Sequence, residues 1–363
     1  MAFLLIALNE TQNPVLADHS LSKNERYHCP SCKTPVHLKL GAVMRPHFAH
    51  FQNEACEGFS EGETDEHVNG KLQLKEWIER LGYKVELEAY LSELKQRPDL
   101  LVHVEDRRIA LEFQCSFIPI KKTIERTNGY LKAGYEVIWV LGDQFTYLNR
   151  LTEFQKACLY QKDNQLQLLH YDVEKQKLTI RSQFNYDRVK YLTAKKQVYH
   201  TNRVQLLRKF NVESPKIGRV NIKRRHYKLI RRLTPRTKPF TELLYVNQES
   251  LISMPKELYE VVPNQWMIQT FEYEWKYRFA LWLESLDPGK VITRKVLMKR
   301  LDEMDMEYSL IPQATDIQRL APFYEFLTVL IRTGVVKKIG YNKWSYQKPL
   351  KRYKYLEEKF KNE

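Results

Sequence analysis

The feature that most constrains the fold is a change of apolar spacing between residues 62 and 142. Apolar residues first recur at roughly helical spacing from Val68 to Leu81, and Gly82 can end that helix. The stretches "KVELEAYL", "RPDLLVHV" and "RRIALEFQCS" then predict three strands, and "IPIKKTIERTNGYLKAG" predicts a second helix with Pro119 in its first turn. The nearly all-apolar "YEVIWVLG" is typical of a buried parallel strand. The predicted order, helix-strand-strand-strand-helix-strand, indicates an α/β core.

The length indicates more than one domain, because 363 residues exceed what a single core usually holds. We expect a Cys- and His-rich module at 1–60, the α/β domain at 61–188, a basic segment at 189–240 and a helical domain at 241–363. No stretch approaches the roughly 18–20 apolar residues that span a membrane. The N-terminal "AFLLIAL" lacks a preceding basic region and a following cleavage site. We therefore expect a strand there and a cytoplasmic protein without a membrane span.

A cluster of cysteines and histidines predicts a structural zinc site in the N-terminal module. Cys29 and Cys32 form a CxxC, and His47, His50 and Cys56 follow. Zinc prefers tetrahedral thiolate and imidazole ligands, and a CxxC lets one turn present two thiolates. If 47–50 is extended, the two histidines point to opposite faces, so we favour the one nearer Cys56, His50. The alternative is a redox-active cysteine pair.

Two carboxylates, Asp99 and Glu112, stand in adjacent apolar strands. If these strands form a hairpin, the two side chains can approach each other at one end of the sheet, and Gln114 shares the face of Glu112. Carboxylates hold Mg²⁺ or Mn²⁺, which neutralises charge and activates water in phosphodiester hydrolysis. The alternative is a charged strand end without chemistry, although an apolar run such as "IALEFQCS" should not carry an unpaired carboxylate.

The predicted first helix offers further polar groups. Glu63, His67 and Lys71 are four residues apart, so all three can share one helical face. This face could be directed at Asp99 and Glu112 and contribute to catalysis. The alternative is a solvated stripe, because charged residues at this spacing are common on helices.

Up to about residue 142, the sequence resembles the CoiA-like family of competence proteins, whose core is similar to PD-(D/E)xK restriction-endonuclease-like nucleases. The resemblance rests on "CPSC…RPHFAH…C", "EGETDEHVNGK", "RPDLLV", "ALEFQCS" and "IERTNGYLKAGYEVIWVLG". It implies that 61–188 is a nuclease-like domain with metal-binding carboxylates at Asp99 and Glu112. It also implies that Arg126 and Tyr130, in the second helix, face the substrate.

Gln114 stands where the common nuclease pattern has a lysine. A neutral amide can position water but cannot supply a full charge. Either Lys71 or His67 replaces the lysine, or the site binds metal and DNA with little cutting. The first reading is a metal-dependent deoxyribonuclease that processes incoming or recombining DNA in natural transformation. The alternative is a non-catalytic DNA-binding or recombination-mediator protein. Expected partners are single-stranded or branched DNA and a recombinase or other competence proteins.

The excess positive charge lies in one region. Residues 190–238 hold 16 Lys and Arg against one acid, while the whole chain carries +15. Such a segment indicates phosphate binding, and the alternative is a solubilising linker. The expected DNA contacts are Lys223, Arg224, Arg225, Tyr227, Lys228, Arg231 and Arg232. Further on, a helix, helix, hairpin order suggests a winged-helix-like module with Lys337, Lys338, Lys343 and Trp344 on the wing, or else an ordinary helical subdomain.

Overall fold

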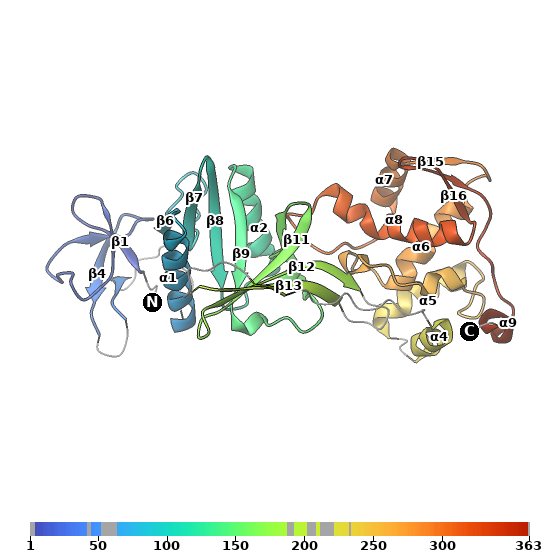
Figure 1. The fold of residues 1–363 in the computed structure, drawn as a ribbon, viewed down its shortest axis with the longest axis horizontal. Helices are drawn as coiled ribbons and strands as arrows, with labels where there is room; N and C mark the ends of the chain where they lie inside the picture. The colour runs from blue at the N-terminus through green and yellow to red at the C-terminus, as the bar shows by residue number, and fades with distance from the viewer. Residues whose placement is uncertain are drawn as a thin grey trace. The chain divides into compact units, whose positions relative to one another are not determined.

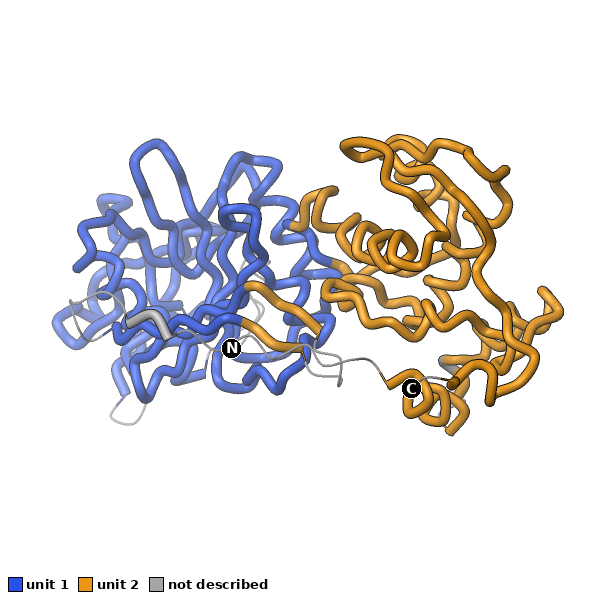
Figure 2. Tube along the Cα trace, turned by 45° about the vertical axis from the view of Figure 1, so that its right-hand side comes forward, with its two compact units in different colours: residues 1–182, 195–211, 311–313 blue, residues 183–194, 212–310, 314–363 orange. Residues whose placement is uncertain are grey.

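The computed structural model describes residues 4–41, 45–51, 64–186, 192–201, 208–210, 221–231 and 234–361. The chain divides into two compact units (Figure 2). Unit 1 comprises residues 1–182, 195–211 and 311–313, and unit 2 comprises the rest. Glu63, Cys56 and Arg232, which the sequence singles out, lie outside the described residues. In the part that is described, no helix is long and apolar enough to cross a bilayer.

The N-terminal module of unit 1 is a five-stranded antiparallel sheet with the order β2-β1-β3-β4-β5. Its strands are β1 (Ile6–Leu8), β2 (Pro14–Leu16), β3 (Tyr27–His28), β4 (Pro35–Lys39) and β5 (His47–His50). Tyr27 and Phe48 pack with ring centroids 4.8 Å apart in a small apolar core. This core holds the turn between β3 and β4, which carries the two cysteines.

The rest of unit 1 is built on a nine-stranded mixed sheet (Figure 1). In chain order its first elements are α1 (Asp65–Arg80), β6 (Lys84–Leu87), β7 (Leu100–Val104), β8 (Arg107–Gln114), α2 (Ile120–Lys132) and β9 (Glu136–Leu141). The sheet order is β14-β13-β12-β11-β9-β8-β7-β6, and β10 pairs with β11. Strands β6, β7 and β8 are antiparallel, whereas β8, β9 and β11 are parallel. The element order from α1 to β9 matches the one that the apolar spacing predicts.

The remaining elements of this sheet follow β9. They are a 3₁₀ turn at Asp143–Phe145, α3 (Glu153–Ala157), β10 (Tyr160–Lys162), β11 (Gln165–Asp172), β12 (Lys177–Tyr186), β13 (Leu192–His200) and β14 (Arg208–Phe210). Strands β11 and β12 pair as an antiparallel hairpin.

Helices α1 and α2 cover opposite faces of the sheet (Figure 1). Successive side chains of β8 therefore point alternately towards α1 and towards α2. Phe113 belongs to the apolar core that includes Val68 and Leu74 of α1. Its neighbour Glu112 contacts α2 instead. Thr64 caps α1 by accepting a hydrogen bond from the His67 N–H, and Gly82 follows the helix with φ +89°.

Unit 2 is helical with one small sheet (Figure 2). Its helices are α4 (Ile222–Ile230), α5 (Lys238–Val246), α6 (Glu272–Glu284), α7 (Arg294–Glu303), α8 (Asp316–Arg332) and α9 (Leu356–Phe360), with short 3₁₀ turns at Pro235–Thr237, Lys256–Tyr259 and Gln265–Met267. Strands β15 (Val291–Thr293), β16 (Val336–Gly340) and β17 (Lys343–Tyr346) form an antiparallel sheet with the order β15-β17-β16. Aromatic side chains of α6 and α8 fill the core, with Trp275 and Phe323 at 5.3 Å.

Candidate active site and metal centre

Asp99 is fixed at the end of the β7–β8 hairpin by contacts from two elements. It directly precedes β7, and its Oδ2 accepts a hydrogen bond from the Phe113 N–H at 2.8 Å. The same oxygen lies 3.2 Å from Nε2 of His67 on α1. Burial raises the pKa of Asp99, but the His67 and Lys71 charges and the two hydrogen bonds outweigh it, so the pKa lies well below its usual range. Asp99 therefore stays ionised at neutral pH.

Lys71 joins Asp99 to a second buried acid. Its Nζ lies 2.6 Å from Oε1 of Glu88 and 3.6 Å from Oδ1 of Asp99, and the Lys71 side chain is fully buried. Arg97 donates to the other Glu88 oxygen at 2.8 Å. Burial raises the pKa of Glu88, but the charges of Arg97 and Lys71 hold it below its usual value. The result is a chain of alternating charges that ends at Asp99.

Glu112, on β8, points towards α2 and is 2% exposed. Its Oε1 accepts hydrogen bonds from Arg126 and from the Tyr130 hydroxyl, the latter at 2.7 Å. Burial raises the pKa of Glu112 to about 7, and the nearby Asp99 charge adds to that rise, while Arg126 opposes it. The Asp99 charge therefore disfavours ionisation of Glu112, and a cation near both carboxylates would favour it.

The structure corrects the expected role of Tyr130. Its side chain is 0% exposed and donates to Glu112, so it has no surface for a DNA contact. Arg126 is only partly accessible and also donates to the carbonyl of Arg97. Both residues of α2 therefore hold Glu112 in place, and neither lies on the outside of the helix.

Gln114 extends the same face of β8 and is nearly buried. Its Nε2 donates to the carbonyl oxygen of Ser116 at 2.8 Å, which fixes the amide at the end of the strand. Phe117, the next residue, is exposed and packs edge-on against Phe145. A fixed neutral amide at this position can orient a polar ligand but brings no charge to it.

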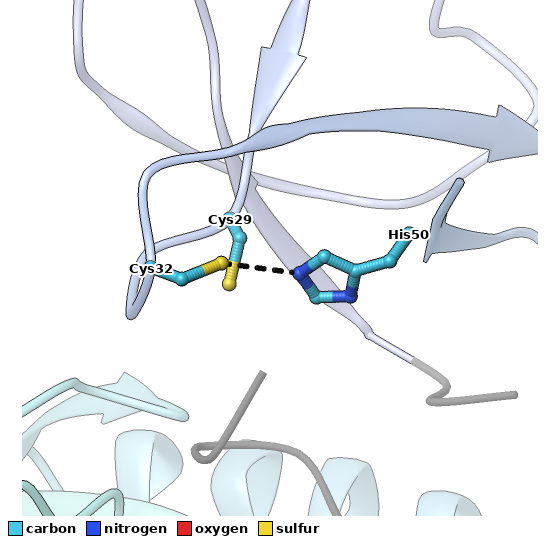
Figure 3. A group of neighbouring side chains, drawn as sticks. All are labelled: Cys29, Cys32 and His50. Carbon is cyan, nitrogen blue, oxygen red and sulfur yellow. Dashed lines mark hydrogen bonds between the residues drawn. The ribbon is translucent and has the colours of Figure 1, made fainter. Parts of the chain in front are cut away.

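In the N-terminal module, Cys29, Cys32 and His50 come together (Figure 3). Their ligand atoms all lie within 4.8 Å of one another, and Sγ of Cys32 is 3.3 Å from Nε2 of His50. Burial raises the pKa of Cys32, but hydrogen bonds from Thr34, His50 and Cys29 lower it overall to about 6. Two sulfurs and one imidazole nitrogen at this spacing could supply three ligands to one metal ion.

His47 is not part of this group. It is buried at the start of β5, and its Nδ1 lies 3.0 Å from the carbonyl oxygen of Arg45. The alternation of β5 places it on the face opposite to His50. Of the two histidines weighed from the sequence, the structure brings only His50 to the cysteines.

Two family models match this chain. The N-terminal domain of competence protein CoiA matches residues 11–59, and the nuclease-like domain of the same protein matches residues 63–214. This chain belongs to the CoiA-like family. Competence protein CoiA of Bacillus subtilis (strain 168) is 35% identical to it over 120 residues. That alignment covers 33% of this chain and 32% of the relative, so the chain spans about a third of the length of the curated relative it matches.

The two CoiA-like matches include both groups of candidate site residues. The Cys29, Cys32 and His50 group falls within the N-terminal match, and Asp99 and Glu112 fall within the nuclease-like match. The matches end at residue 214, so the helical part of unit 2 lies beyond them. The CoiA-like family name supports a role in competence, and its nuclease-like domain agrees with the mixed α/β architecture.

Sequence reasoning missed Glu88 and Arg97. The alternation of "KVELEAYL" indicates a strand through Leu91, but β6 ends at Leu87 because Glu88 adopts φ +51°. This backbone turns the Glu88 carboxylate into the protein towards Lys71. An acid inside an apolar stretch, with an arginine next to Pro98, was the available signal.

Helix α4 presents only part of the expected basic surface. Lys223, Arg224, Tyr227 and Arg231 are exposed, and Lys228 is half-buried. Arg225 differs, because its guanidinium donates to Glu272 at 2.8 Å and its side chain is largely covered. The structure therefore assigns Arg225 to the packing of unit 2 and leaves the other residues as candidate phosphate contacts.

Proposed function

We propose that this chain is a Mg²⁺- or Mn²⁺-dependent deoxyribonuclease of natural competence, with an α1–β9 core of the restriction-endonuclease-like PD-(D/E)xK type. The observation that carries the proposal is the placement of Asp99 and Glu112 at the same end of the β7–β8 hairpin. Membership of the CoiA-like family and its nuclease-like domain support it. The element order from α1 to β9 supports the fold assignment.

The donor set fits a hard divalent cation. Asp99 is ionised, and Glu112 uses Oε1 for both Arg126 and Tyr130, so Oε2 is the oxygen left for a metal. Mg²⁺ usually takes one or two carboxylates and fills its other positions with water and phosphate oxygen. When bound, such a metal supplies charge neutralisation and a more acidic water for attack on phosphorus.

The protein groups have separate tasks in this proposal. Lys71 is fully buried, so it stabilises the Asp99 charge from behind and does not meet the substrate. His67 fixes Asp99 through Oδ2. Gln114 orients water or a phosphate oxygen as a neutral group. Glu63 lies outside the described residues, so its assignment to the site rests on its spacing from His67 and Lys71 and on the resemblance.

The surrounding parts supply binding and support. A structural Zn²⁺ at Cys29, Cys32 and His50, with Cys56 as fourth ligand, would lock the N-terminal module. Exposed Lys223, Arg224 and Tyr227 on α4 would bind DNA phosphates and bases without reading sequence. The substrate would be single-stranded or branched DNA in the cytoplasm, with a recombinase or another competence protein as partner.

A non-catalytic DNA-binding or recombination-mediator function is the second candidate. The favouring observations are Gln114 in place of a lysine and the buried pairing of Glu112 with Arg126. In a protein that only binds DNA, the Glu112–Arg126 pair would have a structural role and would not need to hold a metal. The two candidates differ in whether the bound DNA is cut.

The test uses purified wild-type protein and the Asp99→Asn and Glu112→Gln variants. Each is incubated with end-labelled single-stranded, duplex and branched DNA in Mg²⁺, Mn²⁺ or EDTA. Asp106→Asn, an exposed acid in the turn at the other end of the same hairpin, is the matched control. Metal-dependent cleavage that both site variants lose and the control keeps supports the nuclease. Binding without cleavage in every metal supports the mediator.

A further inference from the structure

The hairpin of β16 and β17, residues 336–346, presents an aromatic side chain at its tip; we call this hairpin the wing. Tyr341 is 90% exposed, and no other large apolar or aromatic side chain in the described ranges is as exposed. Ile339, beside it, is 47% exposed. The tip therefore offers a planar aromatic ring with a polar hydroxyl to any ligand that can stack on it.

The backbone of the wing fixes the tip in this position. The pairing of β16 with β17 shifts between Lys338 and Gly340, which is a bulge at Ile339. Asn342 then closes the turn with φ +50°, a conformation that asparagine adopts more readily than most residues. The carbonyl oxygen of Asn342 accepts a hydrogen bond from the Arg294 N–H at 3.2 Å, which ties the tip to the start of α7.

The base of the wing is rigid. Trp344 is 6% exposed and stacks on Tyr324 of α8 with ring centroids 5.5 Å apart, and β17 also pairs with β15. Trp344 belongs to the hairpin that the sequence predicts as a wing, and its ring packs inward against α8. A rigid base means that the exposed tip loses little conformational entropy on binding.

The positive charge around the tip of the wing favours an anionic ligand. Lys337 and Lys338 are exposed on β16, and Lys343 is exposed on β17, so cations flank Tyr341 on both strands. The wing contains no Asp or Glu. One ring and one isoleucine are too small an apolar area to anchor a protein in a bilayer, whereas a planar ring between cations suits bases between phosphates.

The physics of stacking favours a strand junction over continuous duplex. Inside a duplex, a side chain must unstack a base step before it can enter, which costs a few kcal/mol. At a fork, the last base pair already exposes one face, and the two backbones diverge on either side of it. The wing has the matching order of groups, with cations on each strand and the ring between them.

We propose that the wing binds DNA at a fork or similar strand junction, with Tyr341 stacked on the last base pair and the three flanking lysines on the backbones. This proposal rests on the proposed function and specifies the form of its substrate. Helices α6, α7 and α8 with the β15-β17-β16 sheet would then act as a winged-helix-like module that uses its wing.

The test measures binding in EDTA, so that no cleavage occurs. The probe is a DNA fork with 2-aminopurine in its last base pair, and a relaxed closed circular duplex, which has no exposed base pair, serves as competitor. Tyr341→Ala should weaken fork binding on the order of tenfold and abolish the 2-aminopurine response, while Tyr341→Phe keeps both. Tyr245→Ala, which removes another highly exposed tyrosine of unit 2, should change neither.

Several outcomes would overturn the wing proposal. One is an unchanged fork affinity in Tyr341→Ala, and another is a loss of affinity for the closed circle equal to the loss for the fork. Binding to phosphatidylserine vesicles is measured in parallel, and a Tyr341→Ala variant that loses only vesicle binding would also contradict the proposal. Lys343→Ala should lower the slope of log K against log salt by about one. Asp99→Asn should retain the 2-aminopurine response, so a failure of the nuclease proposal and a failure of the wing proposal give different results.

Discussion

Nζ of Lys71 lies 2.6 Å from Oε1 of Glu88, and both side chains are almost completely buried in the nuclease-like domain. A buried ion pair of this kind adds little stability compared with apolar residues. Removing one partner, however, leaves an uncompensated charge in a low-dielectric site, which is strongly destabilising. This pair also neighbours Asp99. The pair therefore serves to position the Asp99 carboxylate.

Replacing Glu88 should destabilise unit 1. Glu88→Gln leaves Lys71 and Arg97 without their shared carboxylate, and we expect a loss of about 3–5 kcal/mol in the free energy of unfolding. Urea unfolding followed by tryptophan fluorescence measures it. Glu105→Gln, at an exposed turn of the same sheet, should stay within about 0.5 kcal/mol. Equal effects of the two substitutions would contradict the assignment.

Gly70 should not tolerate a methyl group, although alanine favours helices. A Cβ at Gly70 of α1 would overlap the ring of Phe113, whose N–H holds Asp99. We expect Gly70→Ala to cost about 1–3 kcal/mol by overpacking and to reduce cleavage. Gly129→Ala in α2 is the matched control, because its Cβ meets only the flexible end of Gln96 at 2.5 Å. That control should be near neutral, and a neutral Gly70→Ala would show that Phe113 can move freely.

Metal content should follow the cluster in the N-terminal module. We expect one zinc per chain by mass spectrometry of the intact protein, and loss of that zinc in Cys29→Ser and in His50→Asn. His47→Asn should keep it, since His47 points away from the cysteines. Chelation should also lower the melting temperature of the wild type. Zinc-free wild-type protein with unchanged stability would favour a redox role for the cysteines.

Lowering the pH should reduce the free energy of unfolding of unit 2, because His226 is protonated more readily in the unfolded chain. Lys359 donates to the Tyr259 hydroxyl, and the same hydroxyl is hydrogen-bonded to Nδ1 of His226 at 2.7 Å. Burial and the Lys359 charge lower the pKa of His226 to about 4, from 6.5. Protons therefore bind the unfolded chain more readily, and stability falls as the pH drops from 6.5 to 4, by up to about 3 kcal/mol.

Comparison with His226→Gln isolates this effect. Lys359, whose pKa burial lowers to about 7, is already largely charged throughout that pH range, so it adds little to the slope. Urea unfolding at pH 6.5, 5.5 and 4.5 should give a steeper loss for the wild type than for His226→Gln. Parallel losses in the two proteins would mean that His226 accepts its proton inside the fold.

The sequence allowed the hairpin geometry to be predicted because that geometry is local. A short turn between two apolar runs sets the register of β7 and β8, and the register brings Asp99 and Glu112 to one end. The CxxC likewise needs only one turn to bring its sulfurs together. Periodicity also predicted α1, α2 and β9.

Other features depend on contacts between distant segments and could not be predicted in this way. The inward position of Tyr130 follows from its hydrogen bond between α2 and Glu112 of β8, and that of Arg225 follows from its contact with Glu272. The end of β6 depends on the left-handed backbone of Glu88, which the alternation of the strand conceals. Burial of Trp344 depends on Tyr324 of a separate helix.

The most direct measurement of the central claim is Mn²⁺ binding by electron paramagnetic resonance, with zinc-replete protein and uncleavable phosphorothioate DNA. The account predicts a Mn²⁺ site that Asp99→Asn and Glu112→Gln each abolish and that Asp106→Asn retains, with cleavage of ordinary DNA following the same pattern. Mn²⁺ binding that persists unchanged in both site variants would contradict the claim that these two carboxylates hold the metal.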